Sequence, residues 1–227
     1  MGGGEHSPDE RLTLRRATME DLDDVLEVVH GALSLDPKFN YRMPYRDQYP
    51  EDNHKWLRLE YTEYLAQPEK YALMMMTASD YNDKPIAICI WDYAMMEPHL
   101  GGDLGVPEDP RGEVLRRDVN PEHYRAWKTQ ITAGFIRFFF QQYGLQQWHL
   151  WVLCTLPAFR GRGAATRLCK WGLERASQEG MVSTVLATAP NGKKLYEKIG
   201  WDLRGQFTVR VRDEPDHEDI WPMTYDP

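Results

Sequence analysis

The chain has 227 residues, of which 42% are hydrophobic and 12% aromatic, which is enough for one sizeable core. Its formal charge of −8, without a long basic run, argues against a nucleic-acid-binding surface, because phosphate backbones recruit clustered Lys and Arg. No stretch approaches the roughly 20 apolar residues of a membrane span, and the N-terminus lacks the apolar core of a secretory signal. We expect a cytoplasmic protein that binds neither nucleic acid nor membrane and whose acidic surface suits a cationic small molecule or a basic peptide.

The first part of the chain predicts a strand, a helix and a loop. Residues 1–11 are small and polar and are expected to form a disordered tail. Alternating apolar residues over Leu12–Ala17 predict a half-buried strand, and an apolar stripe at helical spacing over Leu22–Leu33 predicts a helix that Thr18 caps. Three prolines among aromatic and basic residues over Asp36–Asp52 predict an irregular loop, either a tethered surface loop or a substrate lid.

The middle of the chain predicts a hairpin followed by a long loop and an aromatic helix. A helix over Asn53–Gln67 precedes two apolar runs, Tyr71–Thr77 and Ile86–Trp91, which a turn-rich connector joins as antiparallel strands. Gly, Pro and charged residues without periodicity predict a loop over Glu97–Asn120. Aromatic residues at three- and four-residue steps then predict a helix over Pro121–Gly144.

The last part alternates predicted strands and helices. Apolar runs bounded by turn residues mark the strands, and apolar faces at helical spacing mark the helices. The final strand contains a proline, which is typical of an edge strand. In chain order we expect a strand over Trp148–Cys154, a helix from Ala164 to about Gly180, a strand over Ser183–Thr188, a helix over Gly192–Ile199, a strand over Trp201–Val211 and an irregular edge strand over Ile220–Tyr225.

Three cysteines, Cys89, Cys154 and Cys169, are odd in number and lack metal-ligand spacing. Each sits in an apolar run, which predicts buried, reduced thiols and no metal site. Cys154 precedes a glycine-rich loop and could in principle act as a nucleophile. Apart from His149, no nearby base is identifiable in the sequence to activate it, so we disfavour that role.

The most informative segment is a strand, a tight loop and a helix start around Arg160-Gly161-Arg162-Gly163. Glycines let a backbone approach an anion closely, and the first turn of a helix offers unpaired N–H groups at the positive end of its dipole. The two arginines add positive charge. This pattern predicts a site for a pyrophosphate.

Two common phosphate-binding motifs fit this segment poorly. A Walker A loop requires Gly-Lys-Ser or Gly-Lys-Thr five residues after a first glycine, and the chain has none. A dinucleotide fingerprint has a third glycine where this chain has Thr166, and an acidic residue after the next strand where this chain has Thr188.

The segment resembles motif A of the GNAT acetyltransferases, which is Gln or Arg, two residues, Gly, one residue, and Gly or Ala. Arg160, Gly163 and Ala165 match that pattern, and Leu153 and Pro157 match the frame before it. Downstream, the run Asn191-Gly192-Lys193-Lys194-Leu195-Tyr196-Glu197-Lys198-Ile199-Gly200-Trp201 is similar to motif B of the same family. Two such motifs in the expected order are more specific than either alone.

The resemblance implies an α/β (α+β) GNAT fold. Such a fold has a mixed, mostly antiparallel central sheet of about six or seven strands, flanked by helices and splayed at the fourth strand. We expect one domain over residues 12–227, with an insertion at about 97–145 between the third and fourth strands. That insertion would either shape the acceptor pocket or brace the sheet.

The resemblance also implies which residues bind the cosubstrate, acetyl-CoA. Main-chain N–H groups of the loop would hold the pyrophosphate, the fourth strand would bond to the pantetheine arm and the acetyl carbonyl, and Asn191 would reach the pantetheine. Tyr196 would protonate the leaving thiolate, or else only pack. The predicted cofactor-binding residues are Leu153, Cys154, Thr155, Arg160, Gly161, Arg162, Gly163, Ala164, Ala165 and Asn191.

His149 occupies the position of the glutamate that serves as general base in histone-type members of the family. Imidazole titrates near neutral pH and suits that role, but a strand histidine between two tryptophans is as often structural. We expect an N-acetyltransferase that acts on a primary amine of a small molecule or basic peptide. A non-catalytic acyl-CoA-binding module and a transferase for another acyl-CoA remain alternatives, and the oligomeric state stays open.

Overall fold

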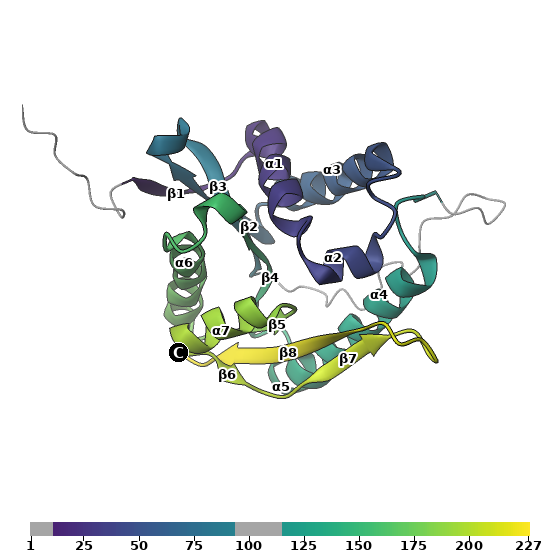
Figure 1. The fold of residues 1–227 in the computed structure, drawn as a ribbon. Helices are drawn as coiled ribbons and strands as arrows, with labels where there is room; N and C mark the ends of the chain where they lie inside the picture. Colours follow the sequence, from purple (N-terminus) through teal and green to yellow (C-terminus); the bar gives the residue numbers. More distant parts are fainter. Residues whose placement is uncertain (1–10, 94–114) are drawn as a thin grey trace, which may run out of the picture.

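The computed structural model describes residues 11–93 and 115–227 (Figure 1). The predicted tail and most of the predicted loop at 97–120 lie outside the described residues. The N-terminal elements are β1 (Leu12–Arg16), a 3₁₀ turn (Met19–Asp21), α1 (Leu22–Leu33), α2 (Pro37–Arg42), α3 (Pro50–Ala66), β2 (Tyr71–Ala78), a second 3₁₀ turn (Ser79–Tyr81) and β3 (Lys84–Asp92). The C-terminal elements are α4 (Pro121–Phe135), a π-helical turn (Ile136–Phe140), α5 (Gln141–Tyr143), β4 (Gln147–Thr155), a third 3₁₀ turn (Pro157–Phe159), α6 (Ala164–Gln178), β5 (Val182–Ala187), α7 (Pro190–Ile199), β6 (Asp202–Leu203), β7 (Phe207–Arg210) and β8 (His217–Tyr225).

The strands form one mixed sheet, which confirms the predicted fold class. Their order is β1-β2-β3-β4-β5-β8-β6, with β7 also paired to β8, and every pairing is antiparallel except that of β4 with β5. The parallel pairing runs only from Gln147 opposite Val182 to Leu150 opposite Val185. Beyond Leu150 the two strands separate, so the sheet is splayed at its fourth strand as predicted.

Helices cover both faces of the sheet, and this explains the run Met74-Met75-Met76. Side chains alternate between the two faces of a strand. Met74 and Met76 pack on the face that α6 covers, whereas Met75 packs with α1 and α3 on the opposite face. All three are at most 5% exposed, which confirms that the methionines fill the core.

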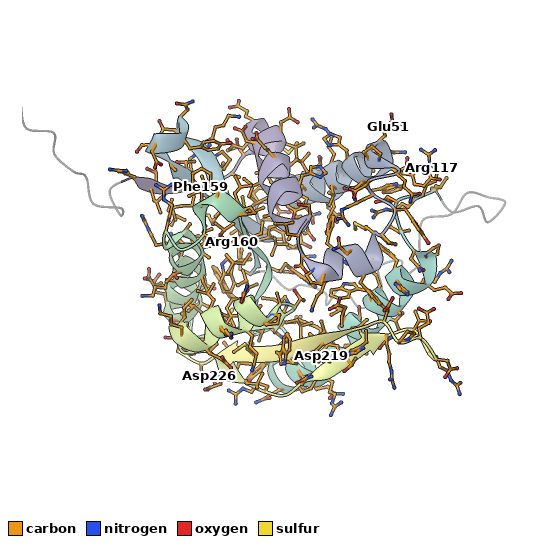
Figure 2. The ribbon with its side chains drawn as sticks, in the orientation of Figure 1. Glu51, Arg117, Phe159, Arg160, Asp219 and Asp226 are labelled. Carbon is orange, nitrogen blue, oxygen red and sulfur yellow. The ribbon has the colours of Figure 1, made fainter. Side chains whose placement is uncertain are left out.

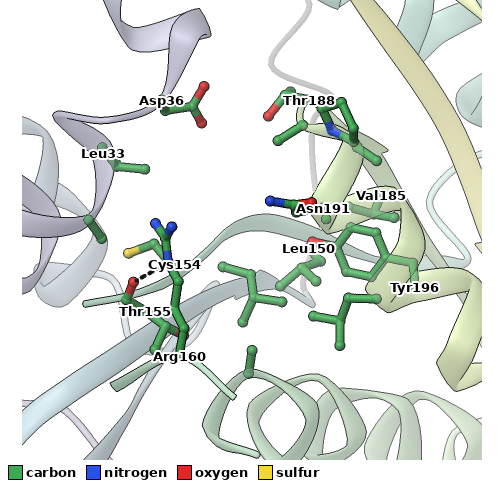
Figure 3. A pocket seen from close by; sticks show the side chains of 18 of the residues that line it. Leu33, Asp36, Leu150, Cys154, Thr155, Arg160, Val185, Thr188, Asn191 and Tyr196 are labelled. Carbon is green, nitrogen blue, oxygen red and sulfur yellow. Dashed lines mark hydrogen bonds between the residues drawn. The ribbon is translucent and has the colours of Figure 1, made fainter. Parts of the chain in front are cut away.

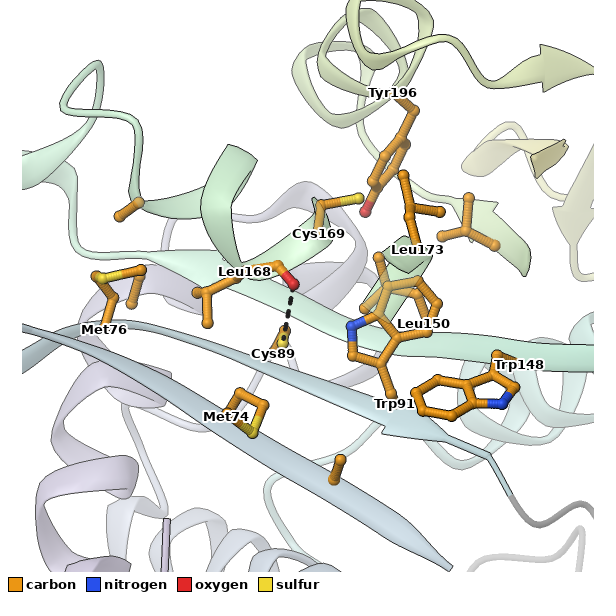
Figure 4. Packing of buried hydrophobic residues seen from close by; sticks show 14 of the residues in the cluster. Met74, Met76, Cys89, Trp91, Trp148, Leu150, Leu168, Cys169, Leu173 and Tyr196 are labelled. Atoms are coloured by element: carbon orange, nitrogen blue, oxygen red, sulfur yellow. Dashed lines mark hydrogen bonds between the residues drawn. The ribbon is translucent and has the colours of Figure 1, made fainter. Parts of the chain in front are cut away.

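Helix α6 lies unusually close to β3. A Cβ atom at Gly172 would come within 2.1 Å of the Trp91 side chain, so only glycine permits this approach. Trp91 is fully buried and packs near Trp148 and Trp201 (Figure 4). This contact fixes α6 against the sheet and places the start of the helix at the point where β4 and β5 separate.

The predicted loop over Asp36–Asp52 is wrong, because two of its prolines begin helices. Pro37 and Pro50 occupy the first turn of α2 and of α3, where the missing N–H costs no hydrogen bond and the fixed φ suits a helix. Asp36 caps α2, since its carboxylate accepts a hydrogen bond of 2.9 Å from the Lys38 N–H. Proline was therefore misread as a breaker where it is an initiator.

The C-terminal strands differ from the prediction in two ways. The expected strand over Trp201–Val211 is divided into β6 and β7, and β8 is an interior strand of nine residues with β5 on one side and β6 and β7 on the other. Pro222 fits inside the sheet because it lies opposite the break between β6 and β7. Its carbonyl still accepts a hydrogen bond from the Arg204 N–H at 2.8 Å.

Candidate active site

A cavity of about 770 Å³ opens where β4 and β5 separate (Figure 3). Its walls come from the end of α1 and the start of α2, from the last residues of β4, from the β4–α6 loop, and from β5 and α7. Within the described residues, no strand pairs with the backbone groups of Trp151 to Thr155 that point away from β3, because the β4–β5 pairing stops at Leu150. One wall therefore offers hydrogen-bonding groups of the main chain.

The loop between β4 and α6 offers further free N–H groups. Gly161 and Gly163 have φ of +80° and +85°, a region that glycine adopts without strain, and a Cβ at either would meet nothing within 4 Å. The N–H groups of residues 161–166 have no acceptor among the described residues, whereas the Arg167 N–H bonds to Gly163 at 3.0 Å. Free N–H groups at the start of a helix are suited to bind an anion, and the pyrophosphate site at this loop stays a prediction.

The two arginines of the loop differ in their surroundings. Arg162 forms an ion pair of 2.7 Å with Asp80 and lies over the Phe159 ring, and this hydrogen bond lowers the pKa of the Asp80 carboxyl. Arg160 is exposed beside the start of α6 (Figure 2), lines the cavity, and places Nε 3.4 Å from the Thr155 carbonyl oxygen. Arg160 is thus the loop arginine whose charge faces the cavity.

The three predicted β4 residues, Leu153, Cys154 and Thr155, all line the cavity. The Cys154 side chain is 7% exposed and packs with the core beneath α1. Burial raises the pKa of its thiol to about 12, so the sulfur is protonated at neutral pH. A protonated thiol is a poor nucleophile, which supports the expectation that Cys154 does not act covalently. Cys89 and Cys169 are likewise free and buried.

Helix α7 brings Asn191 and Tyr196 to the opposite wall of the cavity. Tyr196 is 6% exposed and packs against Trp201, with its hydroxyl end toward Cys169 (Figure 4). Burial, followed by the nearby Cys169 and Cys89 thiols, raises the pKa of Tyr196 well above the ordinary range for tyrosine. The phenol therefore keeps its proton at neutral pH and can donate it.

His149 does not line the cavity. It is 1% exposed and packs edge-on against Trp151, which does line the cavity, with ring centroids 4.7 Å apart. Its Nδ1 lies 2.8 Å from the Thr184 hydroxyl, and that hydroxyl donates to the Gln147 side-chain oxygen at 2.8 Å. Because the hydroxyl proton is used for Gln147, Nδ1 of His149 carries a proton and donates to Thr184.

No sequence pattern indicated the cavity wall that the end of α1 and the start of α2 supply. Asp36 stands there, and it is the one carboxylate among the described residues that line the cavity. Thr188 and Asn191 lie across the cavity from it, with their polar groups turned inward (Figure 3). An Asp before a proline is a helix-start signature, and reading it so would have predicted α2 but not that this acid faces the cavity.

Neither a membrane-spanning helix nor a metal-binding cluster is found in the part of the chain that the structure describes. Within residues 11–93 and 115–227, no helix combines the length and apolar composition needed to cross a bilayer. The same residues hold no group of three or more His, Cys, Asp or Glu side chains that could bind a metal ion.

The fold and the site place the chain in the class of acyltransferases with a splayed mixed sheet and a glycine-rich loop at a helix start. A family model described as the acetyltransferase (GNAT) family matches residues 40–201. This match covers most of the chain, so the protein belongs to the GNAT acetyltransferase family and is an acyltransferase enzyme. No curated protein matches the chain.

Solved structures with a similar fold include several N-acetyltransferases. Arylalkylamine N-acetyltransferase 2 from Aedes aegypti is 14% identical with a TM-score of 0.68, covering 95% of this chain and 98% of that one. The Drosophila melanogaster polyamine N-acetyltransferase is 11% identical with a TM-score of 0.67, covering 95% and 100%. A histone acetyltransferase HPA2-related protein from Corynebacterium glutamicum is 19% identical with a TM-score of 0.60, covering 96% and 97%. At these identities the likeness concerns the fold.

Proposed function

We propose that the protein transfers the acetyl group of acetyl-CoA directly to a primary amine of a small molecule or a basic peptide. One observation carries the proposal: a single cavity is lined by a loop of free N–H groups, by the unpaired side of β4 and by the protonated Tyr196. The printed names of similar structures, which include arylalkylamine and polyamine N-acetyltransferases, support an amine acceptor. We further propose a single cytoplasmic domain over residues 12–227, with an insertion at about 97–145.

The proposed acetyl-CoA site fits the donors that the cavity presents. Phosphate oxygens accept hydrogen bonds from N–H groups at a helix start, and the loop residues from Gly161 to Ala165 supply them. Arg160 adds a positive charge, and Arg162 would contribute once it exchanges Asp80 for a phosphate. The backbone of Leu153, Cys154 and Thr155 would bond to the amide groups of the pantetheine arm, with Asn191 on the opposite wall.

The proposed reaction is a direct attack on the thioester. The substrate ammonium first loses a proton to solvent. The neutral nitrogen then forms a C–N bond with the acetyl carbonyl carbon, the C–S bond breaks, and the nitrogen gives up a second proton that replaces the one Tyr196 donates. Tyr196 donates its proton to the departing sulfur, which leaves as the thiol of CoA. The raised pKa of Tyr196 keeps this proton in place until the sulfur develops negative charge. No protein nucleophile takes part, in keeping with the protonated Cys154 thiol.

We assign His149 an indirect role in place of the predicted role as a base. Its ring is held by Thr184 and Gln147 and packs against Trp151, so it fixes the orientation of that indole in the cavity wall. For His149 to act as the base, a proton would have to travel from the cavity past Trp151. The general-base role of His149 therefore stays a prediction, which a pH profile tests.

Acetyl-CoA binding and acceptor-dependent thiol release test the proposal together. Calorimetry measures the affinity for acetyl-CoA, and a thiol reagent follows turnover with monoamines, polyamines, arylamines and basic peptides. We expect binding together with thiol release that depends on an amine. Tight binding without turnover for any amine would favour a non-catalytic acyl-CoA-binding module, and tighter binding of a longer acyl-CoA would favour a different donor. Absence of binding would overturn the assignment of the loop.

A further inference from the structure

The part of the cavity that we assign to the acceptor is mostly apolar and holds one acid. We define the acceptor wall as six of the cavity-lining residues that belong neither to the loop nor to α7, namely Leu33, Leu35, Asp36, Pro37, Trp151 and Leu186. Five of these six residues are apolar, and Leu35 is 64% exposed at the surface. A wall of this kind favours a substrate body of hydrocarbon, because burying apolar surface is favourable whereas burying an unpaired polar group is costly.

The carboxylate of Asp36 is available to a ligand. One of its oxygens accepts the Lys38 N–H at 2.9 Å, and among the described residues no cation forms an ion pair with it. Its position is fixed by the next turn of α2, where Lys38 forms an ion pair of 2.6 Å with Glu218 of β8 and both side chains are largely buried. A rigid, part-buried carboxylate in an apolar wall is a suitable partner for one ammonium group.

The other charged groups that line the cavity are cations. Arg160 and Lys198 belong to the loop and to α7, the side that we assign to acetyl-CoA. A second positive charge on the acceptor would find no second acid on the described cavity walls and would be repelled by these cations. Burying such a charge without a partner would cost free energy that a singly charged amine does not lose.

We propose that Asp36 binds the acceptor as an ammonium ion, that this ion then releases a proton to solvent so that the same nitrogen attacks the thioester, and that the acceptor is a monoamine carried on an alkyl or aryl arm, rather than a diamine or polyamine. This inference rests on the proposed function and names its substrate class. The alternative acid of this region, Glu218, is engaged by Lys38 and does not line the cavity. Asp36 here is a binding residue, whose loss should appear in KM for the amine.

A matched pair of amines tests the substrate class with the full-length protein. Hexylamine and 1,6-diaminohexane share one chain and differ by a terminal ammonium group. We expect kcat/KM for hexylamine to exceed that for the diamine by about tenfold or more. 2-Phenylethylamine should behave like hexylamine, and spermidine like the diamine. A preference for the diamine or for spermidine would overturn the inference while leaving the acetyltransferase assignment intact.

Variants test the role of Asp36. Asp36→Asn keeps a side chain that caps a helix but removes the charge, so KM for hexylamine should rise about tenfold or more, with unchanged affinity for acetyl-CoA. Asp47→Asn is the matched control, since Asp47 is 90% exposed, lies on the surface after α2 and does not line the cavity. An Asp36→Asn variant with the KM of the wild type would overturn the assignment.

A gain-of-function variant tests the same inference without relying on a loss. Leu35→Glu adds a second carboxylate at an exposed position of the acceptor wall, and we expect it to raise the diamine-to-monoamine ratio of kcat/KM by about tenfold. Leu59→Glu on α3 is the control, because Leu59 is 53% exposed and does not line the cavity. An unchanged diamine-to-monoamine ratio in Leu35→Glu would contradict the assignment of the acceptor wall. If acetyl-CoA binds but no amine releases thiol, the proposed function fails and this inference with it.

Discussion

The two sides of the cavity are built in different ways. The side that we propose for the cofactor, from β4 through the loop into α6, presents main-chain groups, and its loop contains two glycines with positive φ and N–H groups that have no acceptor among the described residues. The side that we propose for the acceptor presents side chains from segments far apart in the sequence, Asp36 between α1 and α2 and Trp151 on β4. A site made of main-chain groups binds any ligand with suitably placed phosphates, whereas the ligand preference of a site made of side chains depends on each residue.

This difference teaches where specificity lies. Replacing a side chain on the acceptor wall changes which ligand is favoured, while the fold of the wall persists. Replacing a glycine of the loop changes the backbone itself, because other residues rarely adopt these φ angles. Substitutions on the two sides should therefore separate cleanly into effects on the cofactor and effects on the acceptor.

The largest effect is expected at the loop. Gly163→Glu forces a side chain onto φ of +85° and places a carboxylate where we propose the pyrophosphate, so affinity for acetyl-CoA should fall by about a hundredfold or more. Gly180→Glu carries the same kind of strain at φ of +66° in a turn outside the cavity and serves as the control. Wild-type affinity in Gly163→Glu, measured by calorimetry, would show that the loop does not bind the cofactor.

Tyr196→Phe should separate chemistry from binding. Removing the hydroxyl removes the proton donor but keeps the packing on Trp201, so kcat should fall by about a hundredfold with little change in acetyl-CoA affinity. Tyr225→Phe is the control, since Tyr225 also packs near Trp201 and does not line the cavity. Equal kcat in the two variants, from steady-state thiol release, would leave Tyr196 a packing residue only.

His149 tests the comparison of the two sides further, because this residue packs behind Trp151 of the acceptor wall. His149→Gln should lower the free energy of unfolding by about 2 kcal/mol, because the buried Thr184 and Gln147 lose a well-placed partner. We expect kcat/KM to change by less than about fivefold, with the same dependence on pH. Loss of a rise in kcat/KM between about pH 5 and 8 would instead restore the general-base role.

The smallest effect is expected at the far end of α1, remote from the cavity. The Arg15 guanidinium lies 2.6 Å from Asp21 and lowers the pKa of that carboxyl to about 2. Because the folded-state pKa lies below the unfolded one, the stabilisation is present above about pH 4 and is lost as the pH falls through about 2. Asp21→Asn should cost about 1 kcal/mol at pH 7. In urea titrations this difference should shrink at acid pH, with unchanged activity at pH 7.

The sequence by itself determined the features that depend on neighbouring residues. Periodicity predicted β2, β3, α1 and α6, which the structure confirms, because that signal comes from residues that are close along the chain. The glycine spacing is equally local, and the anion-binding loop that it indicates stays a prediction. Local rules were less reliable at prolines. Pro37 was taken as a breaker, although Asp36 before it is a local signature of a helix start. Pro222 was taken as the mark of an edge strand, because the strands on either side of β8 lie elsewhere in the chain.

Only the tertiary structure decided which side chains meet in the cavity. Asp36 and Tyr196 are 160 positions apart in the numbering, and no pattern in the sequence pairs them. His149 and Trp151 share one face of β4, yet only Trp151 lines the cavity, because β5 still pairs with β4 at His149 and the pairing has ended by Trp151. The glycine spacing in the sequence predicted a cofactor loop. The packing of α1, α2 and β4 around that loop decided which acid faces the cavity.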